Sequence, residues 1–491
     1  MVDLAQLLAP LALPFTVPAL PVSQLQRDSR RICAGDLFVA MAGHQVDGRQ
    51  FVDAAIAAGA AAVLIDGDSD SLCWREQVPL LTISGLAGYL PQLAARFYGQ
   101  PGQQLQLVGI TGTNGKTSTS HLCAQLSELL GERAAVIGTL GNGPLGQLLH
   151  SLNTTPDAVA LQQLLRQFAD SGVRRVAMEV SSHGLVQGRV DAVPLRTAVF
   201  TNLTRDHLDY HGTMEAYRDA KRLLFRHPEV NTAVLNVDDA EGRLLLTHVD
   251  STLAIIAFGE HANRDHAERF VSVRDLQLLG DGIHGTLLSE DEEFPFFCPL
   301  LGRFNVSNLL AVVAVARSWG YPLATIAPVL AHLKPVNGRM ELFHRSGLPA
   351  MVVDYAHTPD ALEQVLRAAR GHCHGQLWCV FGCGGDRDRG KRPLMAAAAA
   401  AGADRLVVTA DNPRSESFDQ IVADMRPGWG GAEVTIVADR RQAIRDAFAA
   451  AAPADLVLIA GKGHETYQII GTTRHNYSDR AVVQQLLEEG T

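Results

Sequence analysis

A glycine-rich turn early in the second hundred residues carries the clearest chemistry of the sequence. It lies between an apolar, strand-like run at 105–111 and a helical pattern that begins at 117. In such a turn, backbone N–H groups and the helix dipole hold phosphate, a lysine reaches the terminal phosphates and a threonine hydroxyl binds magnesium. The residues at these positions are Gly112, Thr113, Asn114, Gly115, Lys116, Thr117 and Ser118. We therefore predict an ATP-binding loop, in which Lys116 and Thr117 fill the two named roles.

The spacing of this loop departs from the common phosphate-loop pattern. The leading glycine is Gly109, and position 110 is isoleucine. An ordinary glycine-rich turn between a strand and a helix is the alternative interpretation. The Gly-Lys-Thr run at the entrance of the helix favours phosphate binding.

Two further polar positions stand where a sheet would present them to a ligand. Glu179 lies at the carboxyl end of the apolar run 175–180, and parallel sheets bind ligands at that end of their strands. A structural polar strand end is the alternative. His207 lies in a segment that also contains Asp206, Asp209 and His211. From the residues alone, a solvated surface turn is the simpler interpretation of that segment.

These residues need a scaffold, and the alternation of patterns along the chain predicts one. Apolar runs between residues 105 and 236 alternate with helical stretches, which is typical of a mostly parallel sheet covered on both faces. A smaller α/β pattern precedes them, and the alternation restarts after a break at 333–338. We predict an α/β protein with three domains: a small N-terminal α/β domain at 1–88, a central P-loop-type ATPase domain with a parallel sheet at 89–334, and a C-terminal Rossmann-like, doubly wound domain at 335–491.

Several local features extend this prediction. Thr155 with Pro156, and Thr358 with Pro359, each predict a capped helix start. The alanine-rich runs at 54–63 and 395–403 predict buried helices, because they are too short to span a membrane. Residues 258–297 are the least regular stretch and predict an antiparallel edge with long loops.

Composition limits the classes of partner. Hydrophobic residues make up 47% and charged residues 19% of the 491 residues, an ordinary globular balance. The net charge of −10 argues against nucleic acid or an anionic membrane as the main partner. The seven cysteines lack the spacing of a zinc site, and we expect a reducing, cytoplasmic environment. The apolar start of the chain is broken by three prolines and makes a poor signal peptide.

Taken together in order, the motifs resemble those of one family. The loop Thr-Gly-Thr-Asn-Gly-Lys-Thr at 111–117 is similar to the signature of the Mur ligase family. The resemblance covers nearly the whole chain, through the stretches at 153–156, 178–183, 202–211, 302–305, 354–359 and 461–465.

The resemblance implies an ATP-dependent ligase. Such an enzyme activates a carboxylate as an acyl phosphate, which an amine attacks to form an amide, with ADP and phosphate as the other products. Within the family, the chain is similar to members that add meso-diaminopimelate to UDP-N-acetylmuramoyl-L-alanyl-D-glutamate in peptidoglycan synthesis. The resemblance implies catalytic roles for Lys116, Glu179, His207 and Lys221. It also implies a magnesium ion held by Thr117 and Glu179, and a second magnesium ion bound by His207. Lys221, after reaction with CO2 to a carbamate, would be a further oxygen ligand for a hard metal.

The resemblance further assigns three sets of binding residues. The ribose and adenine side of ATP would lie near Asn305, Arg339 and Asp354. The UDP-linked substrate would contact Arg27, Ser29, His44, Gln45, Val46, Asn153, Thr154, Thr155, Ser181, Gln187 and Arg189. The diaminopimelate pocket would consist of Arg387, Asp411, Asn412, Pro413, Arg414, Gly461 and Glu465. Family members carry a small apolar residue near position 27, so Arg27 departs from the pattern.

The choice of amine depends on Arg414, whose planar guanidinium can hold the extra carboxylate of diaminopimelate with two hydrogen bonds. The alternative is that Arg414 caps its loop against a neighbouring acid such as Glu416. Rival functions are a sister ligase that uses L-lysine, a ligase similar to folylpolyglutamate synthetase, and a nucleotide switch without ligase chemistry. We expect small-molecule substrates, no nucleic acid, no membrane and a monomer.

Overall fold

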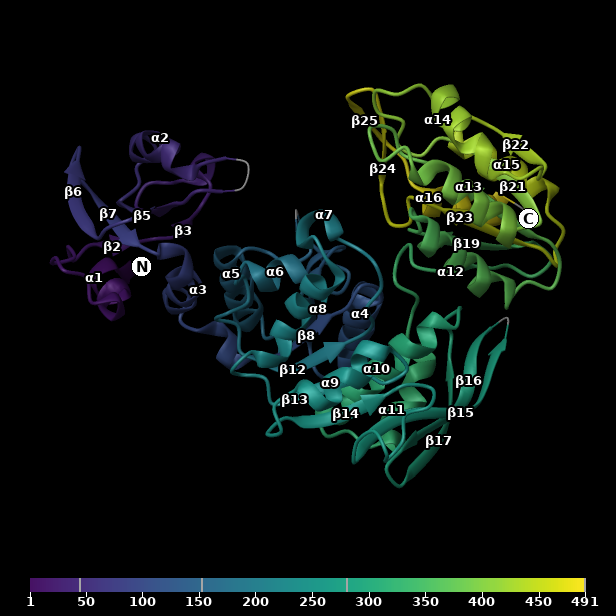
Figure 1. The fold of residues 1–491 in the computed structure, drawn as a ribbon, viewed down its shortest axis with the longest axis horizontal. Helices are drawn as coiled ribbons and strands as arrows, with labels where there is room; N and C mark the ends of the chain where they lie inside the picture. Colours follow the sequence, from purple (N-terminus) through teal and green to yellow (C-terminus); the bar gives the residue numbers. More distant parts are fainter. Residues whose placement is uncertain (44–45, 152, 280, 490–491) are drawn as a thin grey trace. The chain divides into compact units, whose positions relative to one another are not determined.

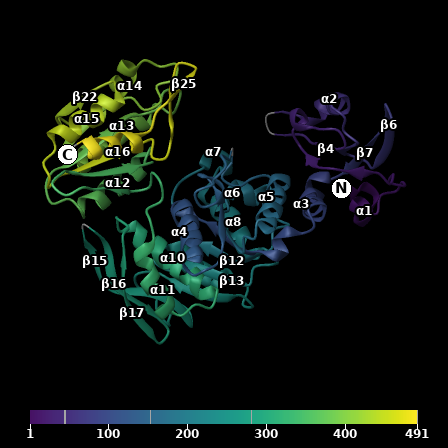
Figure 2. The same cartoon turned by 180° about the vertical axis from the view of Figure 1, so that it is seen from behind.

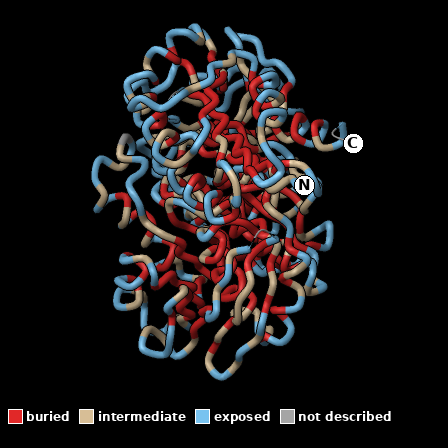
Figure 3. The backbone as a smooth tube through the Cα atoms, turned by 90° about the vertical axis from the view of Figure 1, so that its right-hand side faces the viewer, coloured by how far each residue is buried: buried red, intermediate tan, exposed pale blue. Residues whose placement is uncertain are grey.

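The computed structural model describes residues 1–491 except 44–45, 152, 280 and 490–491 (Figure 1). By internal packing the chain divides into two compact units. The first contains residues 1–120, 131–235 and 241–255, and the second contains residues 121–130, 236–240 and 256–491. Figure 3 shows buried segments inside the molecule and exposed segments along its outer loops.

The N-terminal part of the first unit is built on a five-stranded sheet. Its strands, in sheet order, are β3 (Leu25–Gln26), β4 (Leu37–Ala40), β5 (Ala62–Gly67), β7 (Val78–Ser84) and β6 (Ser71–Arg75). All neighbours are parallel except β6 and β7. Helix α3 (Leu86–Phe97) buries Leu86, Leu90 and Phe97 in the same apolar core as this sheet. The domain boundary predicted at residue 88 therefore falls inside a helix that packs with the N-terminal part.

The central sheet has ten strands, and its parallel part carries the phosphate loop. Several of its strands, among them β12 and β13, are labelled in Figure 2. In sheet order the strands are β10 (Gly141–Pro144), β9 (Ala134–Gly138), β11 (Arg175–Glu179), β8 (Gln106–Thr111), β12 (Leu195–Phe200), β13 (Thr232–Asn236), β14 (Ala254–Phe258), β15 (Arg269–Leu279), β16 (Gly282–Ser289) and β17 (Glu292–Cys298). Strands β9, β11, β8, β12 and β13 are parallel neighbours. Their carboxyl ends consequently meet at one edge, as the alternating pattern predicted.

The irregular stretch after residue 258 differs in part from the prediction. Strands β15, β16 and β17 do form an antiparallel meander. A loop at 259–268 separates β14 from β15, whereas only residues 290–291 separate β16 from β17. Side chains on these strands alternate only irregularly between buried and exposed. The sequence therefore lacks the regular apolar–polar alternation by which a strand is recognised.

The two helix caps predicted from local sequence have different outcomes. Thr358 caps α12 (Pro359–Arg370) by accepting a hydrogen bond from the Ala361 N–H, as predicted. Thr155 is not a cap: α5 (Ala158–Asp170) begins later and is capped by Asp157.

The alanine-rich runs also have different outcomes. The run at 395–403 lies almost wholly in helix α13 (Lys391–Gly402). The run at 54–63 is a helix only in its first part, within α2 (Val52–Ala57), and its last residues begin strand β5. Gly59, with a φ of +95°, makes the turn between the two.

The C-terminal part is a doubly wound domain on a six-stranded sheet. The strands in order are β18 (Glu341–Phe343), β19 (Ala350–Asp354), β23 (Leu456–Ala460), β20 (Leu377–Phe381), β21 (Arg405–Val408) and β22 (Val434–Ile436). Only β18 is antiparallel to its neighbour. Helices α12, α13 and α14 (Phe418–Met425) pack in one apolar core, and α15 (Arg440–Ala450) and α16 (Asp479–Glu489) in the other. The Rossmann-like prediction for this domain is confirmed.

In the described part of the chain, no helix combines the length and apolar character needed to cross a membrane. All seven cysteines are free.

Candidate active site

The phosphate loop joins the end of β8 to the start of α4 (Lys116–Leu129). Gly112 and Gly115 have φ values of +148° and +85°, which side chains other than glycine rarely adopt. A Cβ atom on Gly112 would also overlap the hydroxyl of Thr201. The backbone conformation therefore favours glycine at both positions, and at Gly112 the close approach to Thr201 also requires it.

The segment after β12 fixes the loop from the side. The Asn114 N–H donates to Asn202 Oδ1 at 2.9 Å, and Thr201 Oγ1 donates to the Asn114 carbonyl at 2.6 Å. The Thr113 N–H donates to the Asn202 carbonyl at 2.9 Å. Thr201 and Asn202 were missed in the sequence, although Asn202 begins one of the family stretches. They hold the loop in place from a segment after β12 that is distant in sequence.

Lys116 and Lys221 converge on one carbonyl of the loop. Lys116 Nζ donates to the carbonyls of Gly112 and Thr113, at 2.8 Å in both cases. Lys221, on α8 (Met214–Arg222), is only 2% exposed, and its Nζ donates to the same Gly112 carbonyl at 2.7 Å. Burial, and then the charge of Lys116, lower the pKa of the Lys221 amine well below its usual range. The structure thus brings both predicted lysines to the loop and favours a neutral Lys221.

Glu179 is the acidic group of this site and is 1% exposed. Its carboxylate accepts hydrogen bonds from Thr117 Oγ1 at 3.0 Å and from the Thr139 N–H at 2.9 Å. Among the described residues, no lysine or arginine forms an ion pair with it. A Cβ on Gly138 would overlap Glu179 Oε1. A buried carboxylate beside the threonine hydroxyl of a phosphate loop suits Mg²⁺, which prefers oxygen ligands.

His207 reaches the site less directly. It adopts a left-handed backbone conformation, with a φ of +52°, and its ring lies 6.0 Å from that of Tyr217. The Lys221 amine lies 4.3 Å from the same Tyr217 ring, and the Tyr217 hydroxyl is 3.2 Å from Thr113 Oγ1. Tyr217 therefore connects the surroundings of His207, Lys221 and the loop, a role the sequence did not suggest. The described residues contain no group of three His, Cys, Asp or Glu side chains arranged around a metal position.

Four of the residues assigned to the UDP-linked substrate lie together near the end of β11. Thr155 Oγ1 donates to the Glu179 carbonyl at 2.9 Å and accepts from the Ser181 N–H at 3.0 Å. The Arg189 guanidinium donates to the Thr155 carbonyl at 2.6 Å and to Gln187 Oε1 at 2.6 and 2.9 Å. Burial lowers the pKa of Arg189. Thr155 thus links the Arg189 guanidinium to the strand end that carries Glu179, since it hydrogen-bonds to both residues.

The remaining residues of that set are more scattered. Thr154 Oγ1 lies 3.1 Å from Thr139 Oγ1, next to Glu179, while Asn153 is exposed. Arg27 and Val46 are exposed, and Ser29 begins a short 3₁₀ helix. His44 and Gln45 lie outside the described residues.

The three residues assigned to the far side of ATP lie in the second unit. Asp354 is buried and accepts hydrogen bonds from the N–H groups of Met340 and Ala356, each at 2.7 Å, while burial raises its pKa. The Arg339 guanidinium lies 4.7 Å from the Tyr355 ring. Asn305 is buried, and its amide donates to the Leu301 carbonyl at 2.8 Å. Asp354 and Arg339 are thus placed together, whereas the contacts of Asn305 stabilise its own helix.

The predicted amine pocket lies wholly in the C-terminal domain, and two of its acids share a lysine. Lys462 is 0% exposed, and its Nζ donates to Glu465 Oε2 at 2.9 Å and to Asn412 Oδ1 at 3.0 Å. The same Nζ is 3.5 Å from Asp411 Oδ1. A Cβ on Gly461 would approach Asp411 Oδ2 to 2.9 Å. The sequence did not assign Lys462, because a lysine in a glycine-rich loop gives no sign of the acids it will meet.

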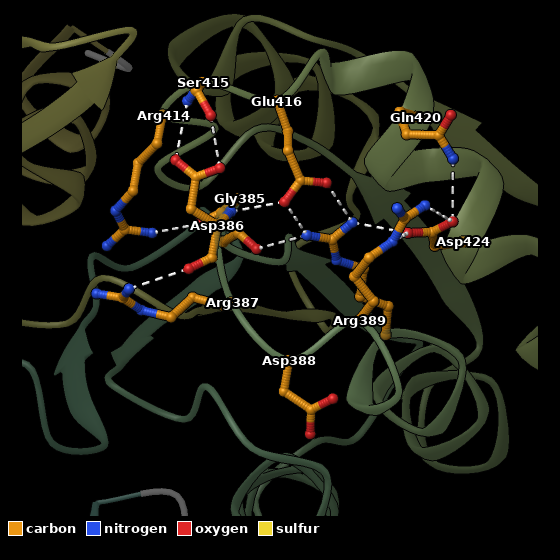
Figure 4. A network of polar contacts seen from close by, with 12 residues as sticks. Gly385, Asp386, Arg387, Asp388, Arg389, Arg414, Ser415, Glu416, Gln420 and Asp424 are labelled. Carbon is orange, nitrogen blue, oxygen red and sulfur yellow. Dashed lines mark hydrogen bonds and ion pairs between the residues drawn. The ribbon is translucent and has the colours of Figure 1, made fainter.

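Arg414 and Arg387 lie on facing loops of this domain (Figure 4). Arg414 donates to the Gly385 carbonyl at 2.8 Å, and Arg387 donates to the Asp386 carbonyl at 3.1 Å. A Cβ on Gly385 would overlap the carbonyl oxygen of Pro413. Within the described chain, no ion pair involves Arg414. Glu416, the acid that the alternative interpretation paired with Arg414, pairs with Arg392 instead.

Comparison with known proteins agrees with this arrangement. The Mur ligase middle domain matches residues 110–316, the glutamate ligase domain of Mur ligases matches residues 338–463, and the Mur ligase family catalytic domain matches residues 21–98. The chain belongs to the Mur ligase family. This Mur ligase is 47% identical, over 94% of its length and 95% of the relative's, to UDP-N-acetylmuramoyl-L-alanyl-D-glutamate–2,6-diaminopimelate ligase of Haemophilus influenzae strain 86-028NP.

Solved structures show the same architecture for this Mur ligase. A structure of a UDP-N-acetylmuramoyl-L-alanyl-D-glutamate–2,6-diaminopimelate ligase is 37% identical, with a TM-score of 0.73, and covers 100% of this chain and 99% of its own. Two more distant structures share the fold alone. MurF of Thermotoga maritima with ADP is 18% identical, with a TM-score of 0.63, and covers 95% of this chain and 96% of its own. Folylpolyglutamate synthase of Mycobacterium tuberculosis is 19% identical, with a TM-score of 0.60, and covers 76% of this chain and 91% of its own.

The loop lysine gives the first prediction from this geometry. We expect Lys116→Ala to lower the rate of product formation by roughly 10²–10³, the scale for losing one preorganised electrostatic contact. Lys116 Nζ donates to two carbonyls of its own loop, so the effect on folding should be small compared with the effect on the rate. The measurements are steady-state rates and the melting temperature. A folded variant with normal turnover would remove the loop from catalysis.

Proposed function

We propose that the chain is the ATP-dependent ligase that joins meso-diaminopimelate to UDP-N-acetylmuramoyl-L-alanyl-D-glutamate. The observation that carries this proposal is the match, over 94% of the chain, to relatives of that name. ATP is the activating substrate, as in the family. The terminal phosphate of ATP passes to the substrate carboxylate, and the incoming amine then displaces phosphate to form the amide.

The geometry of the loop supports this chemistry. A carboxylate and a triphosphate repel each other, so positive charge and N–H donors are needed where they meet. Lys116 lies in the loop that would hold the terminal phosphates. Arg189, together with Thr155 and Ser181, lies beside the end of β11 and offers a planar donor to the anionic substrate.

Magnesium fits the residues near Glu179. We propose Thr117 and Glu179 as ligands of one ion, His207 as a ligand of a second ion, and Lys221 as a further ligand after carbamate formation. When bound, magnesium would neutralise the charge that the reacting oxygens share. The two lysines at the Gly112 carbonyl support the carbamate. As cations they repel each other, whereas a carbamate on Lys221 would lie beside the positive Lys116 and be stabilised by it.

The amine pocket is proposed at Arg387, Asp411, Asn412, Pro413, Arg414, Gly461 and Glu465. Arg414 has no carboxylate partner in the described chain, which leaves its guanidinium for the distal carboxylate of the amine. Glu465, held by Lys462 on one oxygen, would accept the distal ammonium on the other. We propose a cytoplasmic monomer, in which the domains expected at 1–88, 89–334 and 335–491 bind the UDP end, ATP and the amine.

A phosphate-release assay tests this proposal. The purified protein is supplied with ATP, magnesium and the UDP-linked dipeptide, and then with meso-diaminopimelate, L-lysine, D-glutamate or no amine. We expect phosphate release only with the dipeptide and diaminopimelate together, and a product heavier by the added amino acid. Release without an amine would favour a nucleotide switch, and preference for lysine would favour the sister ligase.

A further inference from the structure

A buried arginine lies behind the two loops that would bind the amine. Arg392, in the first turn of α13, is 0% exposed although it carries a permanent charge. Its guanidinium donates to both carboxylate oxygens of Glu416, at 2.7 and 2.8 Å, and to Asp424 Oδ2 at 2.7 Å. Burying an arginine is costly unless its charge is paired. The two acids meet that requirement, and both lie after Arg414 in the chain.

Glu416 joins the two loops through this arginine. Glu416 Oε1 also accepts from the Asp386 N–H at 2.6 Å, and Arg392 donates to the Gly384 carbonyl at 3.2 Å. The hydrogen bonds from Arg392 hold the pKa of Glu416 at about 2, so this acid is ionised at any working pH. Loop 384–387 is therefore tied to loop 412–416 through one ionised carboxylate (Figure 4).

A second link runs directly between the loops. The Asp386 carboxylate accepts from Ser415 Oγ at 2.6 Å and from the Ser415 N–H at 3.2 Å. Ser415 directly follows Arg414, and Asp386 directly precedes Arg387. Arg414 and Arg387, the two arginines proposed to face the amine, are thus direct neighbours in sequence of the two linked residues.

Backbone conformation shows what the links maintain. Asp386 and Arg414 both adopt left-handed conformations, with φ values of +52° and +53°. Residues other than glycine rarely adopt this region, and they do so where the surroundings impose it. The direction of the Arg414 side chain depends on this backbone conformation, which the contacts of Ser415, Glu416 and Gly385 hold in place.

We propose that Arg392 and Glu416 are positioning residues that set the Arg414 guanidinium for the distal carboxylate of the amine substrate. The inference rests on the proposed function, since it concerns the pocket for the amine. Arg392 does not itself contact the substrate. It acts through Glu416 on the two loops, and the selectivity of the ligase for the amine depends on it.

The test compares two variants with a matched control. Arg392→Met removes the central cation, and Glu416→Gln keeps the shape of the acid but removes its charge. Arg389→Met is the control, because Arg389 pairs with the same Asp424, at 2.8 and 2.9 Å, but is exposed and, within the described chain, forms no hydrogen bond or ion pair with Glu416. Wild type is first assayed with both amines, so a failure of the proposed function is recognised separately from a failure of this inference.

The measurement is the KM of each variant for each of the three substrates, and the result depends on which of these KM values changes. Misplacing a binding group by about 1 Å can cost up to ~10²-fold, so we expect both variants to raise the KM for diaminopimelate by about tenfold or more. The KM for ATP and for the UDP-linked dipeptide should stay within about twofold, as should every constant of Arg389→Met. The preference for diaminopimelate over lysine should fall in the two variants.

A purely structural role predicts something different. It would lower the melting temperature and reduce the amount of active enzyme, without changing any KM or the preference between amines. If Arg392→Met does not fold, Glu416→Gln decides, since Glu416 is partly exposed and the substitution is isosteric. An unchanged KM for diaminopimelate in folded Glu416→Gln would overturn the proposal.

Discussion

Lys221→Ala is expected to be nearly inactive, and a short carboxylic acid such as acetate should restore part of its activity. Truncation removes the carbamate oxygens proposed to bind magnesium and leaves a buried space beside the Gly112 carbonyl. A small carboxylate can enter that space and supply the lost oxygens. Lys221→Arg should stay inactive with or without the acid, because guanidinium forms no carbamate. The measurements are amide formation with increasing carboxylate and the melting temperature of each variant.

The pKa of Lys221 adds a condition to that experiment. Only the neutral amine reacts with CO2, and burial lowers the pKa of this amine, so its neutral form persists at a lower pH than that of an exposed lysine. Activity should therefore depend on bicarbonate near neutral pH. Full activity of Lys221→Arg, or of wild type in rigorously CO2-free buffer after long dialysis, would contradict the carbamate.

Arg414→Ala should remove most of the preference for diaminopimelate over L-lysine. Diaminopimelate differs from lysine by one carboxylate on its distal carbon, and Arg414 is the cation proposed to bind it. With lysine bound, the partly buried guanidinium would face no anion, at a cost of ~1–3 kcal/mol or more. Sites built around such a polar pair can reject the shortened analogue by up to ~10⁴-fold. The loss in the variant should therefore fall on diaminopimelate.

The measurement is kcat/KM for both amines in wild type and in Arg414→Ala. Arg370→Ala is a suitable control, since Arg370 pairs with Asp404 elsewhere in the same domain. Equal use of both amines by the wild type would exclude the diaminopimelate assignment and favour the lysine-adding sister ligase. An unchanged preference in the variant would assign the recognition to another residue.

Features that depend only on residues adjacent in sequence could be predicted from the sequence alone. The phosphate loop was predictable because its glycines, lysine and threonine are adjacent and follow an apolar strand. The Thr358 cap was predictable for the same reason. Thr155 has the same local pattern, but its hydroxyl hydrogen-bonds to Glu179 at the end of β11 and to Ser181 at the start of α6 (Ser182–Val186). Helix α5 therefore begins after Thr155.

The residues that sequence reasoning missed depend on partners far along the chain. Lys462 meets Asp411, which lies 51 positions earlier in the chain. Arg392 meets Glu416 and Asp424, which lie 24 and 32 positions later. Tyr217 is buried between the phosphate loop and Lys221. A lysine or arginine in the sequence is most often on the surface, so its burial becomes apparent only when the fold brings acids to it.

The burial of Lys462 has a consequence for the kind of molecule this pocket accepts. Two carboxylates, Asp411 and Glu465, and one ammonium give this corner of the pocket a net charge of −1. In the proposed pocket, an amino group entering there would meet a weakly negative region, whereas a carboxylate of the same substrate would face Arg414. The opposite charges of Glu465 and Arg414 would orient the distal carbon, which carries both an ammonium and a carboxylate. A diamino acid would therefore enter with its distal ammonium toward Glu465 and its distal carboxylate toward Arg414, which leaves the other amino group for the reaction.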